Sequence, residues 1–304
     1  VAVKLFTTDD QTKANEYAIC LNSSNIKRQE IQEGIFKEAI KIIEDDLSYN
    51  KEKIIVVYHE NWHHGVIGIV ASKLVDRYHK PVFVFSVENG KAVGSARSIE
   101  GFNLFKAMES QSDILIKYGG HEQAGGLTIS ALNLELFRKQ INLYANGLIT
   151  DEMLIPETTI DFELEGNDIS LKAAKMISQM EPFGCGNKMP VFCYKSAIIR
   201  EKKTIGNGQH LKLTFEIEGK NIDGVYFGKG YLDMGISPND IVDIVFTQEV
   251  NDFRGVESLQ IKLLDMRLSE ETIKRNRLLF KAARQVECLD CDENWLYNGI
   301  IDKI

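Results

Sequence analysis

The stretch Tyr118-Gly119-Gly120-His121-Glu122-Gln123-Ala124-Gly125-Gly126 is the most unusual pattern in this 304-residue chain. Four glycines within eight residues are costly to order. They are expected where a backbone must adopt positive φ or come close to a ligand. The imidazole of His121 can donate to a phosphate or act as an acid or base. A turn before a strand at Leu127 is the alternative interpretation.

Around this stretch, short apolar strands alternate with helices from Lys53 to about Thr150. This order predicts an α/β domain of about 100 residues. We expect strands at 54–58, 81–86, 91–95 and 127–129, and helices at 66–78, 102–110 and 133–146. In front of the domain we expect a strand at 1–6, a helix at 11–21 and a long amphipathic helix at 25–46 that connects domains.

After a linker at 151–156 the pattern changes to short strands separated by Gly and Asn turns. We expect these strands at 158–164, 191–200, 210–218, 221–227, 241–250 and 259–267, with helices at 170–180 and 269–281. Several strands of similar length favour an OB-fold barrel. The predicted division is 1–50 (domain end and connecting helix), 51–150 (α/β), 151–268 (OB) and 269–304 (helical tail or start of a further domain).

A second candidate for chemistry is Gly94-Ser95-Ala96-Arg97-Ser98, at the end of a predicted strand. Glycine lets a backbone approach a phosphate. Serine supplies a hydroxyl, and the planar guanidinium of arginine matches phosphate oxygens. The motif therefore predicts an anion pocket, unless it is a solvated loop in which Arg97 pairs with a carboxylate such as Glu100.

A third candidate lies in the barrel, where residues 195–229 hold seven Lys and Arg against four acids. Phe215, Tyr226 and Phe227 are interleaved with these charges. Basic residues and aromatics on a barrel face hold single strands without sequence preference. Strand alternation favours the core equally for Phe215. As DNA contacts of this domain we name Lys202, Lys203, Lys212 and Arg254.

Composition and motifs exclude several other classes. The net charge of −8 argues against a generally basic nucleic-acid coat, although a local basic groove is compatible with it. Five scattered cysteines suit a reducing cytoplasm, and Cys288 and Cys291 are expected to be plain thiols. The sequence shows no membrane-length apolar run, P-loop, G-x-S-x-G or H-E-x-x-H motif, and we expect no secretory signal. Neighbouring His63 and His64 point in different directions, so metal binding by them is not expected.

Several separated motifs in one order resemble the DHH-associated domain of RecJ exonucleases. They are Trp62–Ser72, Pro81-Val82, Gly94–Ser98, Gly101-Phe102-Asn103 and Gly119–Gly126. Upstream, Leu21–Gln29 is similar to the long connecting helix of that family. Downstream, Glu181–Asn187 with Pro190-Val191-Phe192, His210–Leu213 and the 251–260 stretch resemble its OB domain. The resemblance covers about residues 1–268.

The resemblance implies a 5′→3′ exonuclease that digests single-stranded DNA with manganese or magnesium. Its metal ligands would lie in an N-terminal DHH domain, whose motifs are absent here. The first residue, Val1, also suggests a start inside a longer protein, so we expect this chain to bind no metal and to cut nothing alone. By the resemblance, Ser95, Arg97 and Ser98 would hold the 5′-phosphate, and Gly119, Gly120 and His121 would line the cleft.

The partners implied by the resemblance are single-stranded DNA and repair or recombination proteins, such as a single-strand-binding protein and a helicase. We expect a cytoplasmic location without membrane contact. One alternative is a DHH-superfamily phosphodiesterase for oligonucleotides or cyclic dinucleotides, although such enzymes normally lack the barrel. The other is a non-catalytic single-stranded-DNA-binding protein.

Overall fold

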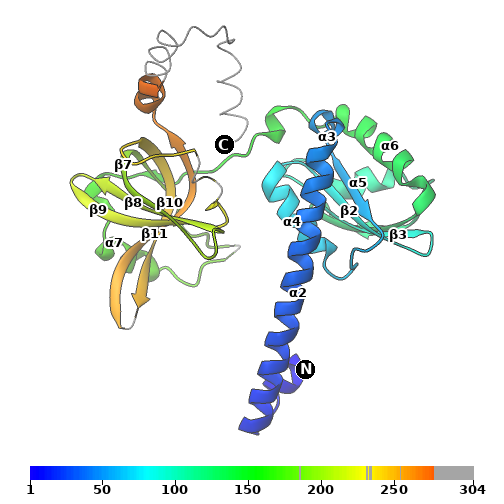
Figure 1. Ribbon diagram of the computed structural model, residues 1–304, viewed down its shortest axis with the longest axis horizontal. Coiled ribbons are helices and arrows are strands. Elements are labelled where there is room, and N and C mark those ends of the chain that lie inside the picture. The colour runs from blue at the N-terminus through cyan, green and yellow to red at the C-terminus, as the bar shows by residue number, and fades with distance from the viewer. Residues whose placement is uncertain (185, 231, 233–234, 254, 277–304) are drawn as a thin grey trace. The chain divides into compact units, whose positions relative to one another are not determined.

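The computed structural model describes residues 1–276 except 185, 231, 233, 234 and 254, and it divides into two compact units after Glu157 (Figure 1). The first unit is an α/β domain with a long helix, and the second is a β-barrel. The predicted fold class, an α/β domain followed by an OB-type barrel, is confirmed. Cys288 and Cys291 lie outside the described residues.

A five-stranded sheet organises the first unit, in the order β1-β2-β3-β5-β4. The strands are β1 (Ile55–His59), β2 (Val82–Glu88), β3 (Lys91–Arg97), β4 (Leu115–Gly120) and β5 (Ala124–Ser130). β1 and β2 are parallel and are joined through helix α4 (Ile67–Tyr78), while the other pairs are antiparallel. β4 was not predicted, because its glycines were interpreted either as backbone that approaches a ligand or as a turn, and neither interpretation placed them in a strand.

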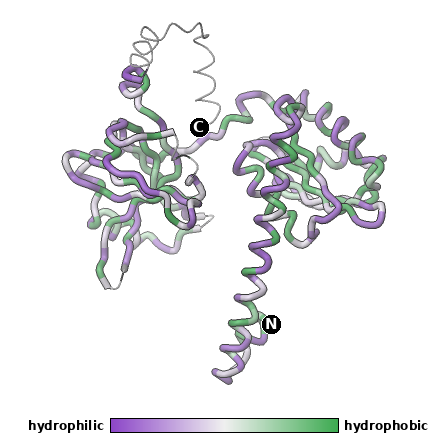
Figure 2. Tube along the Cα trace, viewed as in Figure 1, coloured by the Kyte–Doolittle hydropathy of each residue, from purple (hydrophilic) through white to green (hydrophobic). Residues whose placement is uncertain are grey.

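Helices cover the two faces of the sheet unequally. One face packs on α5 (Leu104–Glu109) and α6 (Leu134–Asn146), around side chains such as Phe83, Phe85 and Phe137. The other face packs on α4 and on the end of α2 (Gln11–Asp45). Apolar residues gather on these strands in Figure 2. Because α4 packs on β2 and β3, the same face of β5 and β4 retains exposed positions such as Gly126 and Lys117.

The N-terminal region differs from its prediction in two respects. Residues 1–6 form the helix α1 (Ala2–Phe6) instead of a strand. α1 packs on α2, and a helix satisfies its own backbone groups where no neighbouring strand is available. The two predicted helices at 11–21 and 25–46 are one continuous helix, α2. Ser24, in the expected break, lies within the continuous helix, and its hydroxyl donates to the carbonyl of Cys20 at 2.9 Å, a local bond that serine forms inside helices.

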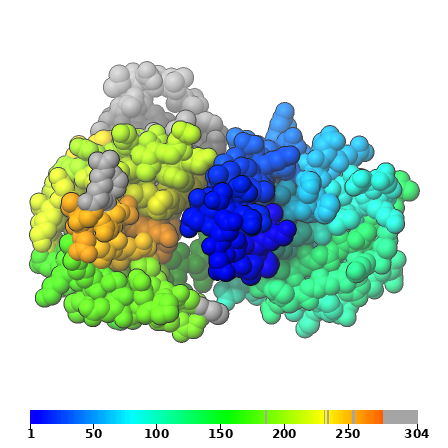
Figure 3. Space-filling model, turned by 90° about the horizontal axis from the view of Figure 1, so that it is seen from below, coloured from blue at the N-terminus to red at the C-terminus, as the bar shows by residue number. Residues whose placement is uncertain are grey.

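The start of α2 is fixed by Asp10, whose carboxylate accepts hydrogen bonds from the amides of Thr12 and Lys13. Only the second half of α2 has buried residues, namely Gln32, Ile35, Ala39 and Ile43. The first half projects from the sheet layers in Figure 1, and Figure 3 looks onto its tip in dark blue. A short helix, α3 (Ser48–Lys51), and a 3₁₀ turn at Glu152–Leu154 flank the domain.

In the second unit five strands close into a barrel in the order β7-β8-β9-β11-β10, with β10 pairing back to β7. They are β7 (Phe192–Ile205), β8 (His210–Ile217), β9 (Lys220–Tyr226), β10 (Ile241–Phe253) and β11 (Val256–Leu268). β9 and β11 run parallel, and the other pairs in this barrel are antiparallel. This closed arrangement of five strands is that of an OB fold.

Buried and outward residues alternate strictly along β8. The buried ones help to fill the barrel, namely Leu211, Leu213, Phe215 and Ile217. Helix α7 (Leu171–Ser178) packs on β10, and β6 (Phe162–Glu163) adds to β7 as a short parallel strand. Most of the predicted 158–164 strand is therefore irregular. The predicted helix at 269–281 is present over 270–276, and its remainder lies outside the described residues.

Candidate nucleic-acid interface

Ser95 and Arg97 lie side by side on one face of β3, because alternate residues of a strand share a face. The Arg97 guanidinium donates to the carbonyl of Ala96 at 2.8 Å and to the Ser95 hydroxyl at 3.4 Å. These bonds hold the charged group against the strand. Both residues are half-buried, and the described residues give Arg97 no carboxylate partner, so the expected alternative of a pair with Glu100 is not observed.

The N-terminus of α4 meets the same two side chains. A Cβ added to Gly68 would lie 3.0 Å from Ser95 Oγ and 3.4 Å from Arg97 Nη2. The N-cap residue is Val66, whose side chain cannot accept a hydrogen bond, and no side-chain cap is formed. The first amides of a helix lack partners within the helix and carry its positive dipole end. The Ser95 hydroxyl and the Arg97 guanidinium therefore lie beside the first turn of α4, and groups of these kinds bind anions.

Beside Ser95, two glycines without side-chain contacts, Gly119 and Gly126, expose the backbone of the sheet; we call them the glycine floor. Ser95 on β3 pairs with Gly126 on β5, and Gly126 pairs with Gly119 on β4, so the three form one row across the sheet. A Cβ on Gly119 would meet nothing within 4 Å, and one on Gly126 would have only the Gly94 carbonyl oxygen at 3.9 Å. Neither residue has a positive φ. Folding therefore does not require glycine at either position, and the bare backbone leaves room for a ligand or another chain to approach closely.

Other glycines in these motifs have structural causes. A Cβ on Gly120, which has a φ of 147°, would lie 2.3 Å from the Ala124 carbonyl oxygen. One on Gly125 would lie 2.5 Å from Met108 Cε. Gly94, which we predicted to approach a phosphate, faces the core, where a Cβ would lie 2.5 Å from the Phe85 ring. Packing explains these three glycines.

The two remaining sequence candidates of this unit differ in accessibility. His121 is exposed in the β4–β5 turn, and its Nδ1 accepts from the amide of Gln123 at 3.3 Å. This bond leaves the Nε2 atom of the ring for other partners. Ser98 is 9% exposed, and its hydroxyl donates to the Phe102 carbonyl at 2.6 Å. The structure gives Ser98 a packing role and leaves Ser95 as the accessible hydroxyl beside Arg97.

A second surface is formed by outward residues of the barrel. Lys203 on β7 pairs with Lys212 on β8, Lys212 with Val225 on β9, and Val225 with Lys262 on β11. Three lysines therefore lie in one register row on the outward side of the strands, with Val225, which is 4% exposed, between Lys212 and Lys262. Lys212 also forms an ion pair with Asp223 at 2.7 Å. Burial alone would raise the pKa of Asp223, but bonds from Lys212 and Thr214 hold that pKa below its usual value.

The other predicted barrel residues lie elsewhere. The Lys202 amine donates to the Ile236 carbonyl at 2.7 Å, and Lys202 alternates with Lys203 toward the opposite face. Arg254 lies outside the described residues. Phe215 and Tyr226 are buried, whereas Phe227 is exposed. Lys262 was not predicted, because the sequence does not show that β11 runs beside β9.

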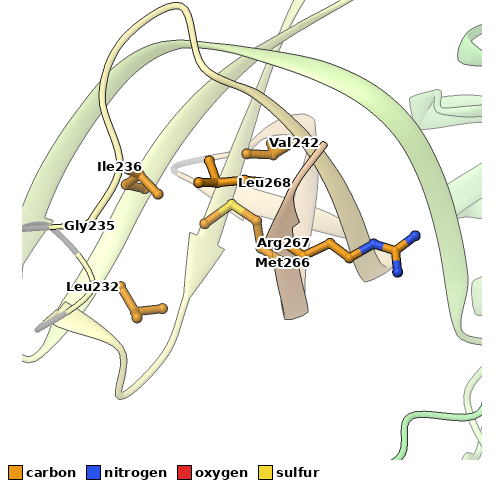
Figure 4. A pocket seen from close by; sticks show the side chains of 7 residues that line it. All are labelled: Leu232, Gly235, Ile236, Val242, Met266, Arg267 and Leu268. Atoms are coloured by element: carbon orange, nitrogen blue, oxygen red, sulfur yellow. The ribbon is translucent and has the colours of Figure 1, made fainter. Parts of the chain in front are cut away.

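No metal cluster is found among the described residues, and the pocket in Figure 4 is small. They contain no group of three or more His, Cys, Asp and Glu side chains that could hold an ion. Figure 4 shows a pocket at the barrel, with apolar side chains from Leu232 to Leu268 and Arg267 pointing away. Its volume of about 20 Å³ has room for roughly one water molecule. This pocket is too small for a nucleotide, and the candidate interface is built from the two open surfaces described above.

Each of the two units matches the model of a known domain family. Residues 51–147 match the family model of the DHHA1 domain, and residues 160–265 match that of the RecJ OB domain. The single-stranded-DNA-specific exonuclease RecJ of Bacillus subtilis is 35% identical over 272 residues, which are 88% of this chain and 34% of that protein. Its namesake from Haemophilus influenzae is 32% identical over 273 residues, 86% of this chain and 47% of that protein.

Solved structures agree with this assignment. The crystal structure of RecJ with Mg²⁺ from Thermus thermophilus superposes with a TM-score of 0.71 at 26% identity, covering 88% of this chain and 40% of that one. The corresponding structure with Mn²⁺ gives a TM-score of 0.70 at 25% identity, covering 86% and 37%. The chain therefore spans between about a third and a half of the length of these relatives.

Proposed function

The chain carries the DHHA1 domain and the OB domain of the RecJ family, and we propose that it is the substrate-holding part of a 5′→3′ exonuclease for single-stranded DNA. In this proposal the first unit holds the 5′-phosphate, and the barrel holds the strand behind it. The observation that carries the proposal is the convergence of Ser95, Arg97 and the uncapped start of α4 beside a glycine floor.

Each part of the first site has a chemical task. The guanidinium and the helix dipole compensate the negative charge of a terminal phosphate. Gly119 and Gly126 let the sugar-phosphate chain lie on the sheet without a side chain between them. The exposed imidazole of His121 can donate to a second phosphate oxygen or exchange a proton there. These residues bind and orient the terminus.

The proposed hydrolysis needs a divalent ion, manganese or magnesium, which would activate the attacking water. The described residues do not fit such an ion, because they offer no cluster of three ligands. We therefore assign this chain no step of bond cleavage, and we expect it to bind single-stranded DNA without cutting it. A single-strand-binding protein and a helicase remain the proposed partners, and cytoplasm the proposed location. None of the described helices combines the length and apolar character of a membrane span.

Fluorescence anisotropy tests the proposal with two single-stranded oligonucleotides that differ only in a 5′-phosphate or a 5′-hydroxyl. The chain should prefer the phosphorylated strand, and Arg97→Ala should weaken its binding about 10- to 100-fold. That range corresponds to losing hydrogen bonds to a charged group, worth about 1.5–3 kcal/mol. Binding of the 5′-hydroxyl strand should change much less.

Lys91→Ala is the matched control, because Lys91 lies on the same face of β3, six residues from Arg97. It removes the same charge at a distance of about 20 Å along the strand. Equal losses in the two variants would indicate a diffuse electrostatic effect and would remove the case for a phosphate pocket. Cleavage by the chain with manganese would contradict its role as a binding part.

A further inference from the structure

Phe227 is an aromatic side chain at the surface of the barrel. It follows β9 directly and is 51% exposed, whereas Phe215 and Tyr226 in the same region are 0% and 5% exposed. Its ring contacts the ring of His210, with centroids 5.2 Å apart and planes at 65°. Single exposed apolar side chains are common on protein surfaces, so a role for Phe227 depends on what lies beside it.

His210 is fixed from two further sides. Its Nδ1 accepts a hydrogen bond from the amide of Gly228 at 3.0 Å. Gly206, in the β7–β8 turn, contacts the other edge of the ring, where an added Cβ would lie 2.9 Å from Cδ2. Gly206 also has a φ of 61°, which favours glycine. The imidazole therefore forms a rigid support for Phe227.

This aromatic pair lies next to the lysine row. His210 is two residues from Lys212 along β8 and shares its outward face. Phe227 lies in the turn after β9 and packs its ring against His210. The separation along the strands is about 7 Å. Positive charges that follow a backbone and an aromatic ring beside them are the two components of single-strand binding surfaces.

We propose that Phe227, supported by His210, is a base-stacking site of the barrel, where one unpaired nucleobase lies on the phenyl ring while its phosphates follow Lys203, Lys212 and Lys262. The inference rests on the proposed binding of single-stranded DNA and assigns the contact that distinguishes single strands from duplexes. Bases within a duplex are stacked on one another and do not present a free face to Phe227.

The test measures binding of the whole chain to a single-stranded oligonucleotide across a salt series. Phe227→Ala should weaken binding about 5- to 150-fold, the range for losing one stacked base. Because stacking releases no counterions, the slope of log K against log salt should stay unchanged. Lys203→Ala should instead reduce that slope by about 0.7. Phe227→Tyr should restore binding, and Phe227→Leu should not.

An oligonucleotide series with a single abasic position moved along the strand supplies the matching change in the ligand. One position should weaken binding to the wild-type chain while having little effect on Phe227→Ala. If Phe227→Ala or Phe227→Leu bound DNA as the wild type does, while Lys203→Ala still reduced the salt slope, the stacking site would be overturned. The proposed binding of DNA by the barrel would then stand. If neither Phe227→Ala nor Lys203→Ala altered binding, the proposed binding of DNA by the barrel would be overturned as well. Thermal unfolding of each variant verifies that the barrel has folded.

Discussion

The two units offer a nucleic-acid strand two different surfaces. In the first unit the proposed contacts are mostly backbone, with bare glycines, a helix terminus and one arginine held by its neighbours. In the barrel they are side chains on a closed sheet, three lysines in a row beside an aromatic pair. The first surface is suited to one defined chemical group, and the second to any strand that passes over it.

This difference predicts that single mutations have large effects in the first unit and smaller, separate effects in the barrel. A backbone surface is destroyed by adding one side chain, because the missing Cβ is the feature that permits contact. A side-chain surface loses its contacts one at a time, and each exposed charge contributes modestly. The following four variants test this contrast, in order of decreasing expected effect.

Gly126→Val should have the largest effect. The added side chain would cover the floor between Ser95 and Gly119, so the preference for a 5′-phosphate should fall at least about tenfold. Stability should stay equal or rise by up to about 1 kcal/mol, because glycine weakens a strand interior. Anisotropy and thermal unfolding measure the two effects.

Gly125→Val is the control for this variant, since its Cβ would meet Met108 at 2.5 Å. Overpacking there should cost about 1–3 kcal/mol of stability. If Gly126→Val bound the phosphorylated strand as the wild type does, the glycine floor would have no part in binding.

Glu38→Leu should have an intermediate effect on phosphate binding, because it should displace the loop before α4. The Glu38 carboxylate accepts from the buried indole of Trp62 at 2.8 Å, and the Trp62 carbonyl accepts from the Ser86 hydroxyl at 2.5 Å. This arrangement fixes the loop before α4 between the long helix and the sheet. Leaving the indole N–H unpaired should cost about 1–3 kcal/mol of unfolding free energy, and the 5′-phosphate preference should fall a few-fold.

Glu38→Gln keeps an accepting oxygen and should recover most of both losses. Chemical denaturation gives the stability, and paired anisotropy titrations give the preference. A normal phosphate preference in a destabilised Glu38→Leu would limit this contact to a structural role.

Sequence patterns predicted the layers of both units because periodicity and turn residues are local properties. They also identified Ser95, Arg97, Gly119 and His121 as candidates, since these residue types are uncommon together. Gly68 and Lys262 were missed, because each joins its site through a neighbour distant in sequence. Sequence also could not separate Gly119 and Gly126 from Gly120 and Gly125, whose difference depends on Met108 and the turn geometry.

Lys262→Ala should have a small effect of a different kind. Loss of one phosphate contact should reduce the salt slope by about 0.7 and weaken binding only a few-fold at moderate salt. Lys195→Ala is the control, since Lys195 is already paired with Glu163 at 2.7 Å. The hydrogen bond that Lys195 donates to Glu163 raises the pKa of Lys195, so that amine stays charged and occupied. Equal salt slopes for wild type and Lys262→Ala would mean that Lys262 does not contact a phosphate.

Asp223→Asn should have the smallest effect and the opposite sign. It releases Lys212 from its ion pair while keeping a polar side chain beside Thr214, so affinity for single-stranded DNA should rise about two- to fivefold at low salt. The depressed pKa of Asp223 adds stability above its unfolded pKa of about 4, and this is lost as pH falls through the folded pKa. Wild type and Asp223→Asn should therefore differ in stability at neutral pH and converge in acid. An unchanged affinity in the variant at every salt concentration would mean that Lys212 does not contact the strand, and the barrel surface would then depend on Lys203, Lys262 and Phe227.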